Sequence, residues 1–460
     1  MNAWVLFSPY RLQRDGALSA RASVRAQAKL AVRQRPAIEG HPSNRAIGFT
    51  RLPCGLAVDE RRRSRQAGPV RDGFTPEGQN RIMHSPPAGS GGDYLAVGQA
   101  QGAHWGLVVK AALESLGPLT ADANVGFVYV TPALADDFSS IVTLLRGATP
   151  VGHWFGAVGH GVIGPEGAAS DGAAVVLMAG RLDSQGLKPF DGADPVEFVR
   201  RHDVWLRSQQ DAYALVHGDA QAIDLPRQLE ALAAQSGAFL AGGLAFPGGA
   251  HVAGQISGAS LSGLLLGDAV PLLTGISQGC QPIGPSHVVG EALDNVVMTL
   301  DGRPALEVLK EEAGEIIARR LARAAGYIHV ALPGDGQDDD PDYAVRNLLG
   351  IDPQRAWLAV GDYLQAGDHL MFVRRDANAA RADLARMLEG MARRLQGRAP
   401  KGGLYIACLG RGAHMFGDDG REAEMIREHL GDFPLIGFSA SGEIWHNRLY
   451  GYTGILVLFL

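Results

Sequence analysis

The sequence predicts an α/β protein with mixed sheets and helices, in which β-α-β-β units repeat and are arranged in two halves. Two observations carry this prediction. Short apolar runs without helical spacing, such as residues 404–408, end in glycine, which is typical of strands covered on both faces. Between such runs lie segments with apolar residues at helical spacing, such as residues 422–430, where Gly431 ends the helix.

The strand–helix–strand–strand pattern occurs three times along the chain, as a duplicated fold would show. Its copies are expected at residues 126–130, 138–145, 151–158 and 173–178; at residues 211–216, 225–234, 238–240 and 259–266; and at residues 404–408, 422–430, 434–438 and 452–460. Duplication is one interpretation. The other is that any α/β chain offers short matches of this kind, and the low identity between the copies leaves both open.

The elements outside these units are predicted from the same signals. They are a strand at 94–97, a helix around 108–113, an amphipathic helix at 195–209, a strand at 288–300, a helix that begins at Pro304, a helix at 316–325, strands at 327–332, 343–349, 357–360 and 369–373, and a helix at 377–395. The run Asp338-Asp339-Asp340 can bind a divalent cation. Without other carboxylates at ligand spacing, a solvated loop is favoured.

Residues 1–93 are expected to be an extension and linker outside the folded part. Residues 1–82 are rich in arginine and show neither strand alternation nor a sustained helical face. Such a segment is typical of a targeting sequence, a nucleic-acid-binding arm or a disordered extension, and we favour the last. Met83, just ahead of the Pro/Gly/Ser-rich linker at 85–92, is then a candidate for the true start.

The composition argues against several classes of protein. A formal net charge of −6 gives no general attraction to nucleic acid or to an anionic membrane. No apolar run reaches the ~18 residues that a membrane-spanning helix needs. The cysteines Cys54, Cys280 and Cys408 form an odd set without a CxxC pair, which argues against disulfides and structural zinc. We therefore expect a cytoplasmic protein without a metal or cofactor.

Polar residues that directly follow the C-terminal strands are the candidate ligand-binding groups, because open α/β sheets bind ligands at their strand ends. Arg411 can clamp a carboxylate and Glu443 can take an ammonium, which together suit an amino acid. Ser439 and Ser441 lie in a Gly-rich loop whose free N–H groups can bind the same carboxylate. The alternative is an ion pair between Arg411 and Glu443 that locks two loops together.

Cys408 is a candidate catalytic nucleophile, with His414 or His446 as the general base. Against it, a cysteine that closes an apolar strand is more often a core residue. Cys280, among glycines and prolines, is interpreted as a packing residue of a tight turn.

His160 and His217 each follow a strand and are candidates to line a pocket, although a lone loop histidine usually lies at the surface. Residues 159–164 read GHGVIG, the spacing of a dinucleotide-binding loop. Pro165 and Gly167 follow where a helix must begin, so NAD binding is excluded.

Several blocks together resemble the FIST family, whose members carry an N-terminal and a C-terminal half. Residues 278–284 (QGCQPIG) and 300–306 (LDGRPAL) are similar to its junction, and Arg374-Arg375-Asp376 to the start of its C-terminal half. The residues that match its closing motifs are Cys408, Gly410, Arg411, Gly412, Gly437, Phe438, Ser441, Gly442, Glu443, His446, Asn447, Tyr452 and Thr453. The N-terminal match is looser, since residues 158–161 read VGHG where the family tends to have a small hydroxyl or cysteine before the glycine.

The resemblance implies FIST domains at residues 94–318 and 319–460. It also implies a sensory protein of intracellular signal transduction, known from bacteria, that binds a small ligand such as an amino acid, passes the signal to a protein partner and has no catalysis of its own. The alternative function is a thiol- or hydrolase-type enzyme that uses Cys408. An unusually acidic, fast-reacting thiol would favour the enzyme, and an inert thiol would favour the sensor.

Overall fold

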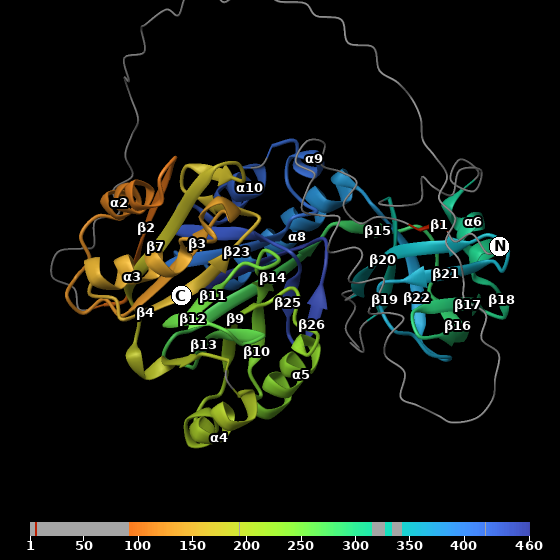
Figure 1. The fold of residues 1–460 in the computed structure, drawn as a ribbon, viewed down its shortest axis with the longest axis horizontal. Helices are drawn as coiled ribbons and strands as arrows, with labels where there is room; N and C mark the ends of the chain where they lie inside the picture. The colour runs from red at the N-terminus through yellow and green to blue at the C-terminus, as the bar shows by residue number, and fades with distance from the viewer. Residues whose placement is uncertain (1–4, 7–91, 193, 315–326, 334–342, 419) are drawn as a thin grey trace, which may run out of the picture. The chain divides into compact units, whose positions relative to one another are not determined.

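The computed structural model describes residues 5–6, 92–192, 194–314, 327–333, 343–418 and 420–460. The expectations for most of residues 1–93, for the helix at 316–325 and for the Asp338–Asp340 loop lie outside these ranges. Within them the α/β class is confirmed, because helices alternate with strands in mixed sheets (Figure 1).

Three repeats of one topology account for most of the described chain. The first contains β2 (Tyr94–Gly102), α2 (Trp105–Leu116), β3 (Val125–Val130), α3 (Phe138–Ala148), β4 (His153–Val158), β5 (Gly161–Gly164), β6 (Gly167–Ala169) and β7 (Ala173–Arg181). The second contains β8 (Leu187–Phe190), α4 (Pro195–Leu206), β9 (Tyr213–Gly218), α5 (Leu225–Ser236), β10 (Phe239–Leu244), β11 (His251–Ala253), β12 (Gln255–Ser257) and β13 (Leu261–Leu266).

The third repeat is interrupted after its first strand. It contains β14 (Leu272–Gln278), α8 (Ala377–Leu395), β23 (Gly402–Cys408), α9 (Ala413–Phe416), α10 (Arg421–Leu430), β24 (Leu435–Ala440), β25 (Glu443–Trp445), β26 (Arg448–Tyr450) and β27 (Thr453–Phe459). In each repeat the two strands that flank the second helical segment run parallel, and the last strand runs antiparallel beside them. The β-α-β-β pattern read from the sequence is therefore present, preceded each time by a further strand and helix.

The small hairpin of each repeat pairs with the sheet of another repeat. Strand β5 of the first repeat pairs with β24 of the third. Strand β25 of the third pairs with β10 of the second, and β11 of the second pairs with β4 of the first. The exchange forms a closed cycle, so residues far apart in the sequence become neighbours at the strand ends.

The three sheets share one inner core, and helices cover their outer faces (Figure 1). Phe127 of the first sheet packs 5.6 Å, between ring centroids, from Phe459 of the third. On the outside, α2 and α3 cover the first sheet, α4 and α5 the second, and α8 to α10 the third. Burial on both faces explains why β3, β23 and β27 read as unbroken apolar runs.

A separate sheet is inserted between β14 and α8. It contains β15 (Cys280–Pro282), β16 (His287–Leu293), β17 (Val296–Leu300), β18 (Arg303–Pro304), α6 (Ala305–Ala313), β19 (Ile328–Pro333), β20 (Tyr343–Asp352), β21 (Trp357–Val360) and β22 (His369–Arg375). The sheet closes on itself in the order β20, β19, β22, β16, β17, β21 and back to β20. The two-residue strand β1 (Val5–Leu6) pairs with β20.

The single strand expected at 288–300 was wrong. Strands β16 and β17 form a hairpin there, and Asp294 at its turn has a φ of 54°. Asp and Asn tolerate this left-handed backbone, so the Asp-Asn dipeptide is a suitable turn sequence. The alternation of apolar residues on both sides of it led to the prediction of one continuous strand. No helix within the described residues is long and apolar enough to cross a membrane.

Candidate functional site

Tyr452 lies directly before β27 and forms the centre of the candidate site. Its φ is 65°, which is uncommon for a residue with a side chain. Two motif glycines lie against it. A Cβ atom at Gly279 would come 2.6 Å from the Tyr452 carbonyl oxygen, and one at Gly410 would come 2.8 Å from its ring. Both positions need glycine because any side chain there would displace Tyr452.

The inserted sheet supplies the other side of the site. The Tyr452 hydroxyl donates a hydrogen bond of 2.8 Å to Asn347 Oδ1. The His329 ring lies 4.5 Å from the Tyr452 ring, between centroids, and the Arg375 guanidinium lies 5.2 Å from the ring centroid. Cys280 belongs to the small apolar core on which Tyr452 packs. Cys408 lies against the Tyr452 backbone, and Glu443 accepts from Thr453, the next residue. We refer to Tyr452, Cys280, His329, Asn347, Arg375, Cys408 and Glu443 as the Tyr452 cluster.

Several buried polar atoms of the Tyr452 cluster make no hydrogen bond of normal geometry to the described residues. They are Glu443 Oε1, both ring nitrogens of His329 and Arg375 Nε. Cys408 beside Glu443 and Asn347 beside His329 are their weak neighbouring partners. The other oxygen of Glu443 accepts from the Thr453 hydroxyl at 2.8 Å and from the Thr453 N–H at 3.2 Å. An unmade buried hydrogen bond costs about 1–3 kcal/mol. Such atoms gathered in one place are suited to a polar ligand or to bound water.

Burial sets the protonation of these groups. It raises the pKa of Glu443 to about 8, so at neutral pH this carboxyl is mostly protonated and Oε1 can donate. Burial, helped by the charge of Arg375, lowers the pKa of His329 to about 4 and keeps the ring neutral. Burial raises the pKa of the Cys280 thiol to about 12. Apart from Arg375, the Tyr452 cluster is therefore largely uncharged at neutral pH.

Arg411 does not pair with Glu443, and that expectation was wrong. Its Nε lies 2.7 Å from Glu422 Oε1, an oxygen that also accepts a 2.6 Å hydrogen bond from the Tyr405 hydroxyl. Its remaining donors reach the Ser277 carbonyl at 3.4 Å, the Ser277 hydroxyl at 3.3 Å and the Tyr452 carbonyl at 3.4 Å. Arg411 thus holds α10, the end of β14 and Tyr452 together.

His160, Ser439 and Ser441 form a second group, which the exchanged hairpin brings together. His160 Nε2 lies 2.9 Å from Ser441 Oγ, and the His160 N–H donates to the Ser439 carbonyl at 2.8 Å. Since Ser441 donates its own proton to the Ala245 carbonyl, its oxygen accepts from His160. Burial lowers the pKa of His160 to about 4.

His217 lies in the inner core rather than on the surface. Its Nε2 lies 3.1 Å from the Tyr129 hydroxyl, and the Phe438 ring packs against both side chains. Burial lowers the pKa of His217 to about 3, and its Nδ1 has no hydrogen-bond partner among the described residues. The interactions that place His217 belong to the shared core, not to the Tyr452 cluster.

Cys408 lies beside Glu443 but lacks the features of an activated nucleophile. Burial raises the pKa of its thiol above the ordinary value. His414 Nε2 lies 2.9 Å from the Gly410 carbonyl and contacts Arg375, whereas His446 Nδ1 lies 3.0 Å from Asn447 Oδ1 and is exposed. A thiol that stays protonated does not favour the enzyme hypothesis.

Arg375, His329 and Tyr452 were not predicted as site residues. Arg375 and Tyr452 occur in the family-like motifs, which is the one signal that points to them. His329 carries no such signal, because it comes from a strand of the inserted sheet.

Comparison with known proteins agrees with the motifs. A model of the FIST N domain matches residues 124–303, and a model of the FIST C domain matches residues 305–446. An uncharacterized protein of Mycobacterium tuberculosis is 39% identical over 199 residues, covering 40% of this chain and 50% of that protein. An uncharacterized protein of Mycobacterium bovis is 35% identical over 242 residues, covering 46% and 61%. The chain spans about half the length of the curated relatives it matches.

Proposed function

The chain belongs to the FIST family, whose domains are small-ligand sensory domains of signal transduction, and from that premise we propose that it binds an amino acid or a related metabolite at the Tyr452 cluster. In this proposal the protein acts in the cytoplasm, passes the signal to a protein partner and catalyses no reaction. The observation that carries it is the gathering of unpartnered buried polar atoms on Glu443, His329 and Arg375 around one tyrosine.

Arg375 and Glu443 are the two groups of the Tyr452 cluster that could pair with the charges of a zwitterion. Arg375 is the cation that we assign to the ligand carboxylate, because its Nε has no acceptor among the described residues although its Nη2 bonds the Gly410 carbonyl. Arg411 is less available, since its donors reach Glu422 and Ser277. Glu443 is the group that we assign to the ligand ammonium. Because Glu443 is mostly protonated in the empty site, an arriving ammonium would lower its pKa and release a proton.

The position of the site suggests how binding is communicated. Glu443 and Cys408 come from the third repeat, whereas Arg375 and His329 come from the inserted sheet. A ligand that contacts both would favour the arrangement in which these parts are closely packed, and a partner protein that senses this arrangement would receive the signal.

A thermal-shift screen of the full chain against amino acids and small metabolites tests the proposal. A ligand at 100 times its Kd stabilises the folded state by about 2.7 kcal/mol. The shift is expected to disappear in Arg375→Ala and to persist in Arg374→Ala. Arg374 is the matched control because it is the neighbouring residue on β22, and adjacent side chains of a strand point to opposite faces.

Calorimetry of a ligand found in this way, in two buffers of different ionisation enthalpy, measures the proton released by Glu443. The ligand would bind elsewhere if the thermal shift persisted in Arg375→Ala. The same would follow if Arg375→Ala and Arg374→Ala lost the shift equally.

A further inference from the structure

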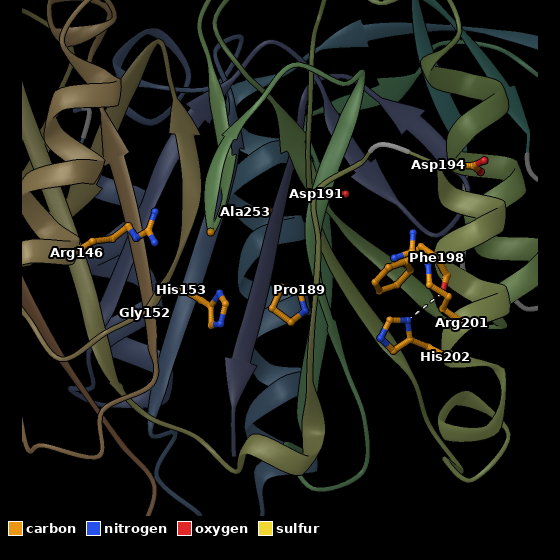
Figure 2. Close-up of a pocket in the computed structure, with 11 residues that line it drawn as sticks. Arg146, Gly152, His153, Pro189, Asp191, Asp194, Phe198, Arg201, His202 and Ala253 are labelled. Carbon is orange, nitrogen blue, oxygen red and sulfur yellow. Dashed lines mark hydrogen bonds between the residues drawn. The ribbon is translucent and has the colours of Figure 1, made fainter.

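An open cleft with a volume of about 350 Å³ lies between the first and second repeats and shares no residue with the Tyr452 cluster. One wall is formed by Arg146 near the end of α3 and by His153 at the start of β4. The facing wall is formed by Arg201 and His202 of α4. Figure 2 shows the two pairs on opposite sides of the cleft, with Pro189 between them.

The exchange of hairpins builds this cleft. Ala253 and Gly254 line it from the β11–β12 hairpin, which belongs to the second repeat but pairs with β4 of the first. Gly254 has a φ of 78°, and a Cβ atom there would come 3.3 Å from His153 Nδ1. The absence of a side chain at Gly254 therefore leaves room for the His153 ring. Residues of both repeats line the cavity.

The basic groups of the cleft are available to a ligand. Arg146 has no ion-pair partner among the described residues. Arg201 pairs with Glu197 at 3.3 Å, but this pair is exposed, and exposed pairs contribute about 0–1 kcal/mol. His202 Nδ1 lies 2.9 Å from the Phe198 carbonyl and donates to it, so Nε2 can donate to an anion only when the ring carries a second proton.

Two acidic residues, Asp191 and Asp194, also line the cleft. Asp194 caps α4, and its Oδ1 accepts from the N–H groups of Val196 at 2.9 Å and Glu197 at 3.1 Å. Figure 2 shows Asp194 on the α4 side of the cleft, away from Arg146. An anion between the two arginines would thus meet basic groups from two directions, while Phe198 and Pro189 offer an apolar surface to its carbon skeleton.

We propose that this cleft is a second binding site, for a small anion with more than one negative charge. A phosphorylated metabolite and a polycarboxylate share this chemistry, and both can accept the two-point hydrogen bonds of arginine. The site is independent of the ligand proposed for the Tyr452 cluster. An anion there would link α3 of the first repeat to α4 of the second.

Isothermal titration of the full chain at constant ionic strength, with pyrophosphate in one series and citrate in another, tests this proposal. Binding of pyrophosphate alone identifies the phosphate class, and binding of citrate alone identifies the polycarboxylate class. Arg146→Gln and Arg201→Gln are each expected to weaken binding about tenfold, the loss of roughly one charge-assisted contact. Arg207→Gln is the control, because Arg207 is an exposed arginine at the end of α4 that pairs with Asp203 and does not line the cleft.

Circular dichroism and thermal midpoints establish that the variants fold, and Arg146→Glu adds a charge reversal that should abolish binding. Arg375→Ala should leave anion binding unchanged, which separates this site from the Tyr452 cluster. The proposal is overturned if neither anion binds, or if Arg207→Gln weakens binding as much as Arg146→Gln and Arg201→Gln do.

Discussion

Arg411 Nε lies 2.7 Å from Glu422 Oε1, and both side chains are buried. The pair joins the loop after β23 to the first turn of α10. Two charges placed in the interior are tolerated because each finds the other and because Tyr405, Ser277 and Tyr452 satisfy further donors and acceptors. Arg411 therefore has a structural role beside the Tyr452 cluster.

Replacing one member of this pair should destabilise the fold. Arg411→Met leaves Glu422 buried without a counter-charge, which typically costs about 3–5 kcal/mol. Urea denaturation monitored by circular dichroism measures the loss. The double variant Arg411→Met/Glu422→Gln, in which Gln can still accept from Tyr405, should recover a large part of it. A loss below about 1 kcal/mol in Arg411→Met would contradict a structural role.

Glu443 should make the free energy of unfolding fall as the pH rises towards 8. Its folded-state pKa of about 8 is raised above the ordinary value of 4.5, so its contribution is complete below pH 4.5 and is lost as the pH rises through 8. The free energy of unfolding then falls by at most about 1.4 kcal/mol per pH unit. Buried His217 and His329, with lowered pKa values, act in the opposite sense below pH 6.5, so the window to examine is pH 6.5–8.

Glu443→Gln keeps the shape of the protonated carboxyl and removes its titration. Urea midpoints from pH 6.5 to 8 should fall more steeply for the native protein than for this variant. Parallel pH profiles would mean that Glu443 is ionised in the folded protein and that another group neutralises it.

The thiols of Cys408 and Cys280 should react slowly with iodoacetamide at pH 7.5. Burial raises the pKa of both, and the thiolate is the reactive form. Mass spectrometry of digested protein after timed alkylation measures each site, with urea-unfolded protein as the reference for full reactivity. If Cys408 reacted faster in the native protein than in the unfolded reference, the result would support a thiol-type enzyme that uses Cys408.

The local elements could be predicted from the sequence, whereas most contacts of the site could not. The helix expected at 377–395 has these bounds as α8, because its apolar face and the Asp376 cap are local signals. The His160–Ser441 contact depends on β5 pairing with β24, which no local pattern encodes. Glu422 looked like an ordinary residue of a helix start, and only the buried position of α10 shows that it neutralises Arg411.

The motif glycines give the last prediction. Gly410→Ala places a methyl group within 2.8–2.9 Å of the Tyr452 ring, closer than van der Waals contact allows, so the ring must leave the position in which it contacts Asn347 and Arg375. Overpacking of this kind typically costs about 1–3 kcal/mol. Gly147→Ala is the control, because a Cβ atom at this helical glycine of α3 meets nothing within 4 Å and should stabilise the protein by up to about 1 kcal/mol. Urea denaturation of both variants measures the two effects, and opposite signs are expected. If Gly410→Ala were as stable as the native protein, the Tyr452 ring would not be held by the contacts described, and the ligand site proposed around it would lose its rigid centre.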